Sequence, residues 1–398
     1  MKNFEFHVDT KILFGKGQVE KLGNEIKEYT DNILLVYGGG SIKRNGIYDD
    51  VLKTLKENNI KVTELSGVQP NPRIESVEEG AKLCKEKKIG GVLAVGGGSS
   101  IDCAKVIAAA ALYEGNPWDL VIEPKKIKGA LPVYSVLTMA ATGSEMDRAA
   151  VISKMDTNEK YGTHSDYFIP RVSVLDPTYT FTVPPKQTAA GIADIMSHTF
   201  ENYFNKEESY FQGQVALAVL KTCVKYGPIA MKEPENYEAR ANIMWASSWA
   251  INGLLQKGCE IPWSVHAMEH ELSAFYDVTH GEGLAVLTPE WMRHVLTEEN
   301  CNRFVEYGRE VWGISNKHSD MEAAKEAIQR TQSFFTEDLG MPASLEELGI
   351  GEDNLERMAE KAVRSEGVIK GFKNLVKEDV RKIYIAALRR SRDKIEKK

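Results

Sequence analysis

Two patterns of hydrophobic and polar residues alternate along the first half of the chain, to about residue 183. Short runs rich in β-branched and aliphatic residues are typical of strands buried in a parallel sheet. These runs lie at residues 33–37, 60–65, 91–95, 131–137 and 172–175. Between the second and third runs, Ile74, Val77, Ala81 and Cys84 recur at helical spacing, which predicts an amphipathic helix. The alternation predicts an open α/β sheet with helices on both faces.

The pattern changes after Val183-Pro184-Pro185. The remaining sequence shows long helical patterns rich in Ala, Glu, Lys and Leu, with almost no strand signal. Two consecutive prolines interrupt regular structure, so they mark a plausible hinge. We therefore predict an α/β domain over residues 1–183 and an all-α domain over residues 184–398.

The composition is that of an ordinary soluble globular protein, with 42% hydrophobic and 27% charged residues. No apolar run approaches the ~18–20 residues of a spanning helix, and Glu5 lies where a signal peptide would be apolar. A net charge of −7 without a basic run argues against nucleic-acid binding. The five cysteines are scattered and form no Cys-x-x-Cys pair, which favours the reducing cytoplasm over a disulfide framework.

Two glycine loops follow predicted strands in the same way. The Gly38–Ser41 loop comes after the first run, and the Gly96–Ser99 loop comes after the third, just before an Ala-rich helix. Backbone N–H groups at such a helix start can bind a phosphate, although Ser99 with Asp102 also resembles a simple helix cap. Two loops at the ends of two strands, with the small-residue segment Thr138–Glu145 after another, predict a dinucleotide-binding domain, although G-x-G-x-x-G is absent.

The second half of the chain contains a cluster of possible metal ligands. Asp194 and His198 are four residues apart, His266 and His270 repeat that spacing, and His280 follows. On a helix, residues four apart share one face. A carboxylate oxygen with imidazoles suits a divalent ion such as Fe²⁺ or Zn²⁺. The alternative is a set of ordinary core or surface histidines; the clustering favours a metal site.

These motifs together resemble those of the iron-containing, metal-dependent alcohol dehydrogenases, in the butanol dehydrogenase and broad aldehyde reductase branch. The resemblance runs nearly end to end, from Thr10–Gly15 through Pro70-Asn71-Pro72 to the histidine block. Its most specific part is Gly191-x-x-Asp194-x-x-x-His198 with His266-x-x-x-His270 and His280-Gly281. It implies a fold similar to dehydroquinate synthase, with the active site between an N-terminal dinucleotide domain and a C-terminal helical domain.

The resemblance also implies a role for individual residues. The metal ligands would be Asp194, His198, His266 and His280, which would hold Fe²⁺ or, alternatively, Zn²⁺. His270 would be an additional active-site histidine close to the substrate and not a ligand. The residues matching the family's cofactor contacts are Gly39, Gly40, Ser41, Asn71, Gly97, Gly98, Ser99, Asp102, Thr138, Thr142 and Lys160.

The activity expected from this resemblance is NAD(P)-dependent oxidation of short-chain primary alcohols such as butanol, and reduction of the matching aldehydes. The metal would polarise the substrate oxygen, and His270 could relay a proton. A lyase of the dehydroquinate synthase type would instead bind a phosphorylated sugar acid, yet residues 191–200 and 261–283 contain no Lys or Arg. A glycerol dehydrogenase and a nucleotide-binding module without catalysis are two further classes that the sequence leaves open.

The first glycine loop favours NADP(H) over NAD(H). An NAD site usually places an acidic residue at a strand end, where it binds the ribose 2′-OH and repels a 2′-phosphate. No acid follows the first strand until Asp49, whereas Ser41, Lys43 and Arg44 can face a phosphate. Alternatively, Lys43 and Arg44 merely begin a solvated helix. We expect the protein to be cytoplasmic and to form a homodimer. Its expected binding partner is a small-molecule substrate, an alcohol or an aldehyde.

Overall fold

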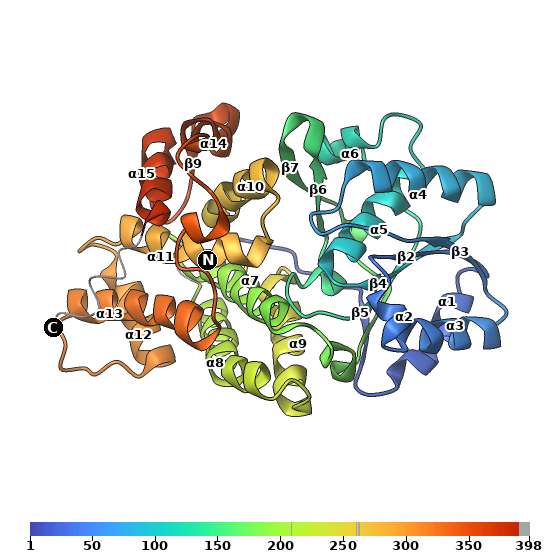
Figure 1. Cartoon of the computed structure of the whole chain (residues 1–398), viewed down its shortest axis with the longest axis horizontal. Helices are drawn as coiled ribbons and strands as arrows, with labels where there is room; N and C mark the ends of the chain where they lie inside the picture. The colour runs from blue at the N-terminus through green and yellow to red at the C-terminus, as the bar shows by residue number, and fades with distance from the viewer. Residues whose placement is uncertain (208, 260, 262, 390–398) are drawn as a thin grey trace.

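The computed structural model describes residues 1–207, 209–259, 261 and 263–389. Figure 1 shows two parts side by side, one built on a sheet and one built of helices. The predicted fold class, an α/β part followed by a helical part, is confirmed. In the described part of the chain, no helix is both long enough and apolar enough to cross a membrane.

The N-terminal part contains a six-stranded parallel sheet with the order β1-β8-β5-β4-β2-β3. Five strands overlap the predicted runs, and the edge strand β1 was not predicted. The strands are β1 (Lys11–Phe14), β2 (Asn32–Tyr37), β3 (Lys61–Leu65), β4 (Gly91–Gly96), β5 (Val133–Leu137) and β8 (Val172–Leu175). An antiparallel pair, β6 (Ala149–Lys154) and β7 (Glu159–His164), lies outside this sheet.

Helices cover both faces of the sheet, which explains why the residues of its central strands are almost all apolar and buried. In β2, Leu34 and Val36 belong to one hydrophobic core, and Ile33 and Leu35 belong to the core on the opposite face. The helices on the first face are α4 (Ile74–Lys87) and α5 (Gly98–Ala110), with the short α6 (Trp118–Ile122) nearby. Those on the second face are α1 (Leu22–Lys27), α2 (Ser41–Arg44) and α3 (Ile47–Glu57).

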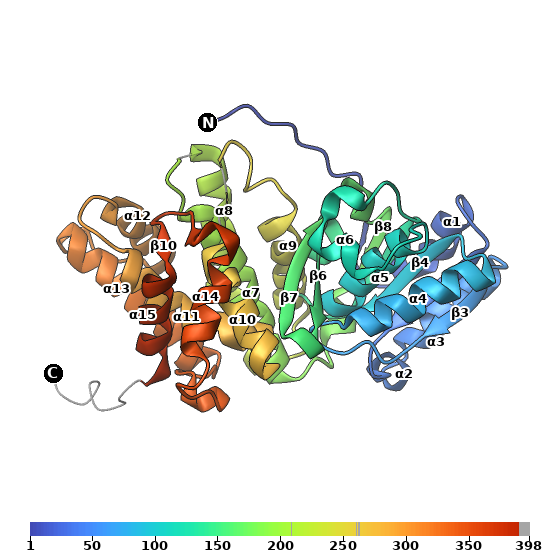
Figure 2. The ribbon, with the colours of Figure 1, turned by 90° about the horizontal axis from the view of Figure 1, so that it is seen from above.

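The helical part is arranged around α7 (Pro185–Tyr203), which is buried from Thr188 to its end. Pro185 is the first residue of α7, a position where a proline loses no helix hydrogen bond. The other helices are α8 (Tyr210–Lys232), α9 (Tyr237–Ile251), α10 (Ser264–Tyr276), α11 (His280–Val295), α12 (Cys301–Trp312), α13 (Asp320–Ser333), α14 (Leu355–Ala362) and α15 (Lys377–Leu388). A short antiparallel pair, β9 (Val368–Ile369) and β10 (Leu375–Val376), interrupts them. Figure 2 shows the N-terminal segment extending from the sheet toward the helices, where the Lys2 N–H donates to the Gly258 carbonyl.

Two glycines allow α7 to approach its neighbours closely. A Cβ atom at Gly281, the second residue of α11, would lie 2.1 Å from the carbonyl oxygen of Ala190. A Cβ atom at Gly191 would lie 2.3 Å from the carbonyl oxygen of Ala140. Both neighbours are backbone atoms, which cannot rotate away. The glycines therefore bring α11 and the loop after β5 against α7.

We expect Gly281→Ala to lower the free energy of unfolding by about 1–3 kcal/mol, because the added methyl group overpacks the contact with Ala190. Gly351→Ala is the matched control, since no atom lies within 4 Å of the new methyl group there. Denaturant unfolding measures both variants. Equal unfolding midpoints for the two variants would show that the helix contact is not tight.

Candidate active site

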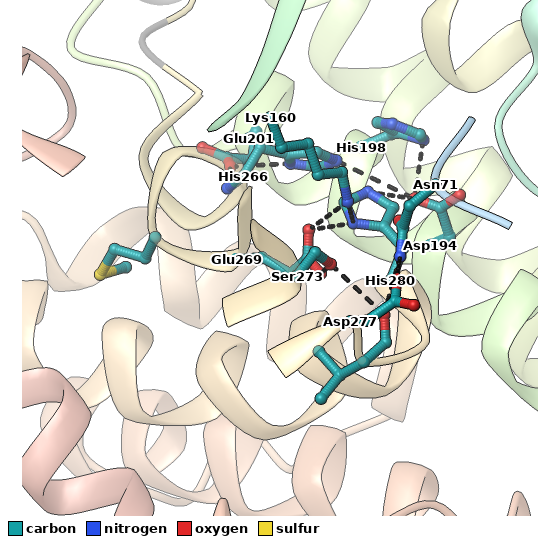
Figure 3. Close-up of polar contacts among 12 residues, drawn as sticks. Asn71, Lys160, Asp194, His198, Glu201, His266, Glu269, Ser273, Asp277 and His280 are labelled. Atoms are coloured by element: carbon teal, nitrogen blue, oxygen red, sulfur yellow. Dashed lines mark hydrogen bonds and ion pairs between the residues drawn. The ribbon is translucent and has the colours of Figure 1, made fainter. Parts of the chain in front are cut away.

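Three helices bring the predicted metal-ligand residues together (Figure 3). Asp194 and His198 lie one turn apart on α7, His266 lies in the first turn of α10, and His280 begins α11. Around the Asp194 Oδ1 atom, His198 Nδ1 lies at 3.5 Å, His280 Nε2 at 3.7 Å and His266 Nε2 at 3.9 Å. One carboxylate oxygen and three imidazoles therefore converge on one point.

Three of the four converging atoms are buried and have no hydrogen-bond partner in the described part of the chain. Among the described residues, Asp194 Oδ1, His198 Nδ1 and His266 Nε2 are in this state. A buried polar atom without a partner costs free energy, so several facing one another call for a specific explanation. Asp194, His198 and His266 each offer a donor atom within 4.8 Å of the others. This donor set, with nitrogen and carboxylate ligands, fits a divalent transition-metal ion.

The charges of Asp194 and His198 also suit a cation. Burial raises the pKa of Asp194, but attraction to His198 and the other histidines outweighs burial and lowers it to about 2. Burial lowers the pKa of His198 to about 3, despite the attraction of Asp194. An ionised aspartate and a neutral imidazole are the forms that bind metals. Burial alone would lower the pKa of His266, but pairing with Asp194 and Glu201 raises it to about 9.

His270 lies beside this centre and not in it. Its ring centroid is 6.3 Å from that of His266 and 5.8 Å from that of His280. Glu269, His270 and His280 form a second group of possible donor atoms. Burial, followed by the positive charge of Lys160, holds the pKa of His270 well below its usual range. The ring is half-buried, and the lowered pKa keeps it neutral near pH 7.

Sequence reasoning missed two buried carboxylates that lie behind the histidines. Glu201 Oε1 is 3.0 Å from His266 Nδ1, and Glu269 Oε2 contacts His280 Nδ1. Glu201 follows Asp194 by seven residues on α7, so two helical turns place both carboxylates on one side of the helix. That spacing was a usable signal for Glu201. No comparable sequence signal pointed to Glu269, apart from its place between His266 and His270.

The predicted phosphate-binding loops meet at one edge of the sheet. Gly39, Gly40 and Ser41 follow β2, and the Gly97–Ser99 segment follows β4. These strands are parallel neighbours, and the chain continues from β2 to β3 on the other side. This reversal of strand order is where nucleotides bind in open α/β sheets. Thr138 joins the same edge, because its N–H donates to the Gly96 carbonyl at 3.0 Å.

The remaining predicted cofactor residues make contacts within the chain. Thr142 lies next to Gly98, where a Cβ atom would be 2.3 Å from its hydroxyl oxygen. The Asp102 carboxylate accepts from the Ser144 hydroxyl at 2.6 Å and from the Val151 N–H at 2.8 Å.

Two more of these residues connect the sheet-containing part to the helical part. The Asn71 amide donates to the Asp277 carboxylate at 3.0 Å. Lys160 Nζ lies 3.2 Å from Glu269 Oε2 and 3.3 Å from His280 Nδ1, so it belongs to the histidine cluster. The cofactor roles of all these residues stay predictions.

An acidic residue also lies near the first glycine loop, where the sequence showed none nearby along the chain. The Glu64 carboxylate accepts hydrogen bonds from the hydroxyls of Tyr37 and Tyr48, both at 2.6 Å. Lys43 Nζ lies 3.5 Å from Glu64 Oε2. Glu64 comes from β3, the strand that pairs with β2, so only the sheet brings it to the loop.

Both parts of the chain match known protein families. Residues 9–177 match the family described as iron-containing alcohol dehydrogenase, and residues 188–388 match its C-terminal domain. The chain therefore belongs to the iron-containing alcohol dehydrogenase family. The predicted family and its class of activity, alcohol dehydrogenase and aldehyde reductase, are confirmed. The family matches favour this class of activity over a lyase of the dehydroquinate synthase type and over a nucleotide-binding module without catalysis.

Individual relatives are similar over nearly their whole length. The chain is 56% identical to NADH-dependent butanol dehydrogenase A of Clostridium acetobutylicum, over 96% of this chain and 99% of the relative. It is 40% identical to the NADPH-dependent aldehyde reductase YqhD of Escherichia coli, over 97% and 100%. The crystal structure of NADH-dependent butanol dehydrogenase A from Thermotoga maritima has a TM-score of 0.93 at 39% identity, covering 98% and 99%.

Proposed function

We propose that the chain interconverts short-chain primary alcohols, such as butanol, and the corresponding aldehydes. Hydride would pass between the carbinol carbon and a nicotinamide cofactor. The observation that carries this proposal is the convergence of three imidazoles on the buried Asp194 oxygen, beside a sheet edge of the nucleotide-binding kind. The names of the relatives, butanol dehydrogenases and an aldehyde reductase, support the substrate class.

The proposed metal ligands are Asp194, His198, His266 and His280, and the proposed ion is Fe²⁺, with Zn²⁺ as the alternative. When bound, such an ion supplies Lewis-acid polarisation of an alcohol or aldehyde oxygen. One carboxylate and three neutral imidazoles leave a divalent ion with net positive charge, as that role requires. His270, neutral and half-buried beside His280, would accept or return the substrate proton.

The proposed nucleotide site follows the carboxyl ends of β2, β4 and β5. It includes the predicted residues Gly39, Gly40, Ser41, Asn71, Gly97, Gly98, Ser99, Asp102, Thr138, Thr142 and Lys160. Helix α5 begins at Gly98 directly after β4, so its first N–H groups are available for a phosphate. Contacts of Asn71 and Lys160 with the helical part support a site at the junction of the two parts.

We also propose a preference for NADP(H). No atom lies within 4 Å of a Cβ atom built on Gly39, so this position leaves room for a 2′-phosphate. Lys43 and Arg44 in α2 follow directly. Glu64 offsets part of the Lys43 charge, so the support rests mainly on the open space at Gly39. The relatives from Clostridium acetobutylicum and Thermotoga maritima are named as NADH-dependent and the one from Escherichia coli as NADPH-dependent, so their names do not carry this preference.

The chain is further proposed to form a homodimer. Among the described residues, the edge strand β1 pairs with β8 and with no other strand. Phe14 of β1 packs edge-on against Trp245 of α9, and both side chains are more than a third exposed. A second copy of the chain could cover this apolar surface.

Analytical ultracentrifugation measures the mass of the protein in solution. We expect Trp245→Glu to shift this mass from that of the dimer toward that of the monomer.

Domain boundaries and compartment are also proposals. We assign residues 1–183 and 184–398 to the two domains, because the large sheet ends with β8 at Leu175 and α7 begins at Pro185. The five cysteines are all unpaired in the structure, which supports a reducing, cytoplasmic setting.

The function is tested by incubating the protein with butanal and reduced cofactor, with and without a chelator. We expect butanal reduction that the chelator abolishes and that added Fe²⁺ or Zn²⁺ restores. A parallel assay with glycerol and oxidised cofactor tests the polyol alternative. Turnover of glycerol without turnover of butanal would contradict the proposed substrate class.

Replacing His198 or His280 by Ala should remove most of the bound metal and almost all alcohol oxidation, because each variant loses one converging donor. Metal content by mass spectrometry and turnover are the two measurements. Normal metal content in either variant would mean that the residue is not a ligand.

His270→Ala should keep its metal and lose rate by ~10²–10⁴, the range of a general acid–base group, or less if water substitutes. The comparison is with His266→Ala, which should lose its metal. If the two variants lose metal equally, His270 is a ligand.

Gly39→Asp should reduce turnover with NADPH far more than with NADH, because the new carboxylate repels a 2′-phosphate and accepts from a 2′-OH. Initial rates with each cofactor measure the ratio. A wild-type preference for NADH, or equal losses with both cofactors, would refute the proposed NADP(H) preference.

A further inference from the structure

Two of the three candidate ligand histidines have a fully buried carboxylate on their far side. Glu201 and Glu269 are 1% and 0% exposed. Glu201 faces Nδ1 of His266, and Glu269 faces Nδ1 of His280 (Figure 3). A buried carboxylate is costly unless charged or polar groups satisfy it, so each needs an explanation.

The Glu201 contact determines which nitrogen of His266 is available for a metal. A carboxylate accepts hydrogen bonds, so the hydrogen of the imidazole lies on Nδ1, 3.0 Å from Glu201 Oε1. In the neutral ring, Nε2 then has the free electron pair, and this atom faces Asp194 Oδ1 at 3.9 Å. The same carboxylate therefore selects the tautomer and aims the ring.

Glu201 also fixes the position of the helix that carries His266. Its Oε2 atom accepts from the Ser264 N–H at 2.5 Å, and its Oε1 atom accepts from the His266 N–H at 2.8 Å. These are orphan N–H groups in the first turn of α10, where the N-cap residue Trp263 provides no side-chain hydrogen bond. A residue of α7 thus caps α10, and the helix that carries Asp194 also holds the start of the helix that carries His266.

Glu269 holds His280 in the same way but is itself anchored differently. Ser273, one turn along α10, donates its hydroxyl hydrogen to Glu269 Oε1. Lys160 Nζ, from β7 in the sheet-containing part, lies 3.2 Å from Glu269 Oε2. The carboxylate behind His266 is therefore held within the helical part, whereas the one behind His280 spans the two parts.

We propose that Glu201 and Glu269 are positioning residues of the metal site, each fixing the Nδ1–H tautomer and the ring orientation of one ligand histidine. The inference rests on the metal-binding function proposed above. Partners of this kind, hydrogen-bonded to a ligand histidine, typically change metal affinity by about 10–100-fold when they are replaced. We expect losses in that range for each carboxylate.

The test measures the affinity of the full chain for Zn²⁺ and Co²⁺ by competition with a chromophoric chelator. The variants are Glu201→Gln and Glu269→Gln, with Ala variants of both as a second pair. Glu271→Gln is the matched control, because Glu271 is also buried on α10 but pairs with Lys361 at 3.6 Å and contacts no ligand histidine in the described structure. Wild-type affinity is expected for the control and weaker binding for the four test variants.

The visible absorption of bound Co²⁺ at saturation provides a readout that a purely structural role would not change. A reoriented ligand ring should alter this spectrum in the Glu201 and Glu269 variants but not in the Glu271 control. Unchanged affinity and an unchanged spectrum in the four test variants would overturn the inference but would not contradict the metal site. Equal losses in the control would overturn it too, and a wild-type chain that binds neither ion would refute the metal site as well.

Discussion

The helical half of this protein is organised around a buried carboxylate. Asp194 is only 3% exposed, and no hydrogen bond reaches its Oδ1 atom from the described residues. A charge in that position needs compensation, which the metal ion proposed between Asp194 and the imidazoles of three helices would supply. The glycines at 191 and 281 let the backbones approach closely enough for this convergence. The geometry of the site therefore depends on the packing of the helices, because the histidine rings reach Asp194 only when the helices are in contact.

A second buried charge, on Glu269, also needs a partner, and this partner connects the two parts of the chain. Lys160 of β7 is 4% exposed and lies against Glu269 of α10, while Asn71 donates to Asp277 beyond the end of α10. A buried ion pair contributes little net stability, because desolvation of both charges offsets their attraction. Its stronger effect is on geometry: each charge is tolerated only with its partner in place. The ion pair therefore fixes the arrangement in which the sheet edge faces the histidines.

Sequence patterns predicted what depends on local periodicity. The central strands were predictable because both faces are buried, and Asp194 and His198 because one helical turn separates them. The edge strand β1 and the β6–β7 hairpin were missed, since their residues are only partly buried. Glu64 and Glu269 gain their partners through sheet pairing and contact between the two parts. No spacing along the chain encodes such contacts.

Four similar histidines acquire different surroundings from these contacts. His198 needs no carboxylate behind it, because the helix sets its distance to Asp194 and its ring stacks on His266 with centroids 4.6 Å apart. His266 and His280 come from different helices, and each is held by its own carboxylate. His270 has no hydrogen-bonded carboxylate among the described residues, and burial with the Lys160 charge lowers its pKa. An imidazole that is neutral, half-buried and free of such a partner suits the proton exchange proposed for His270, whereas rings fixed toward Asp194 do not.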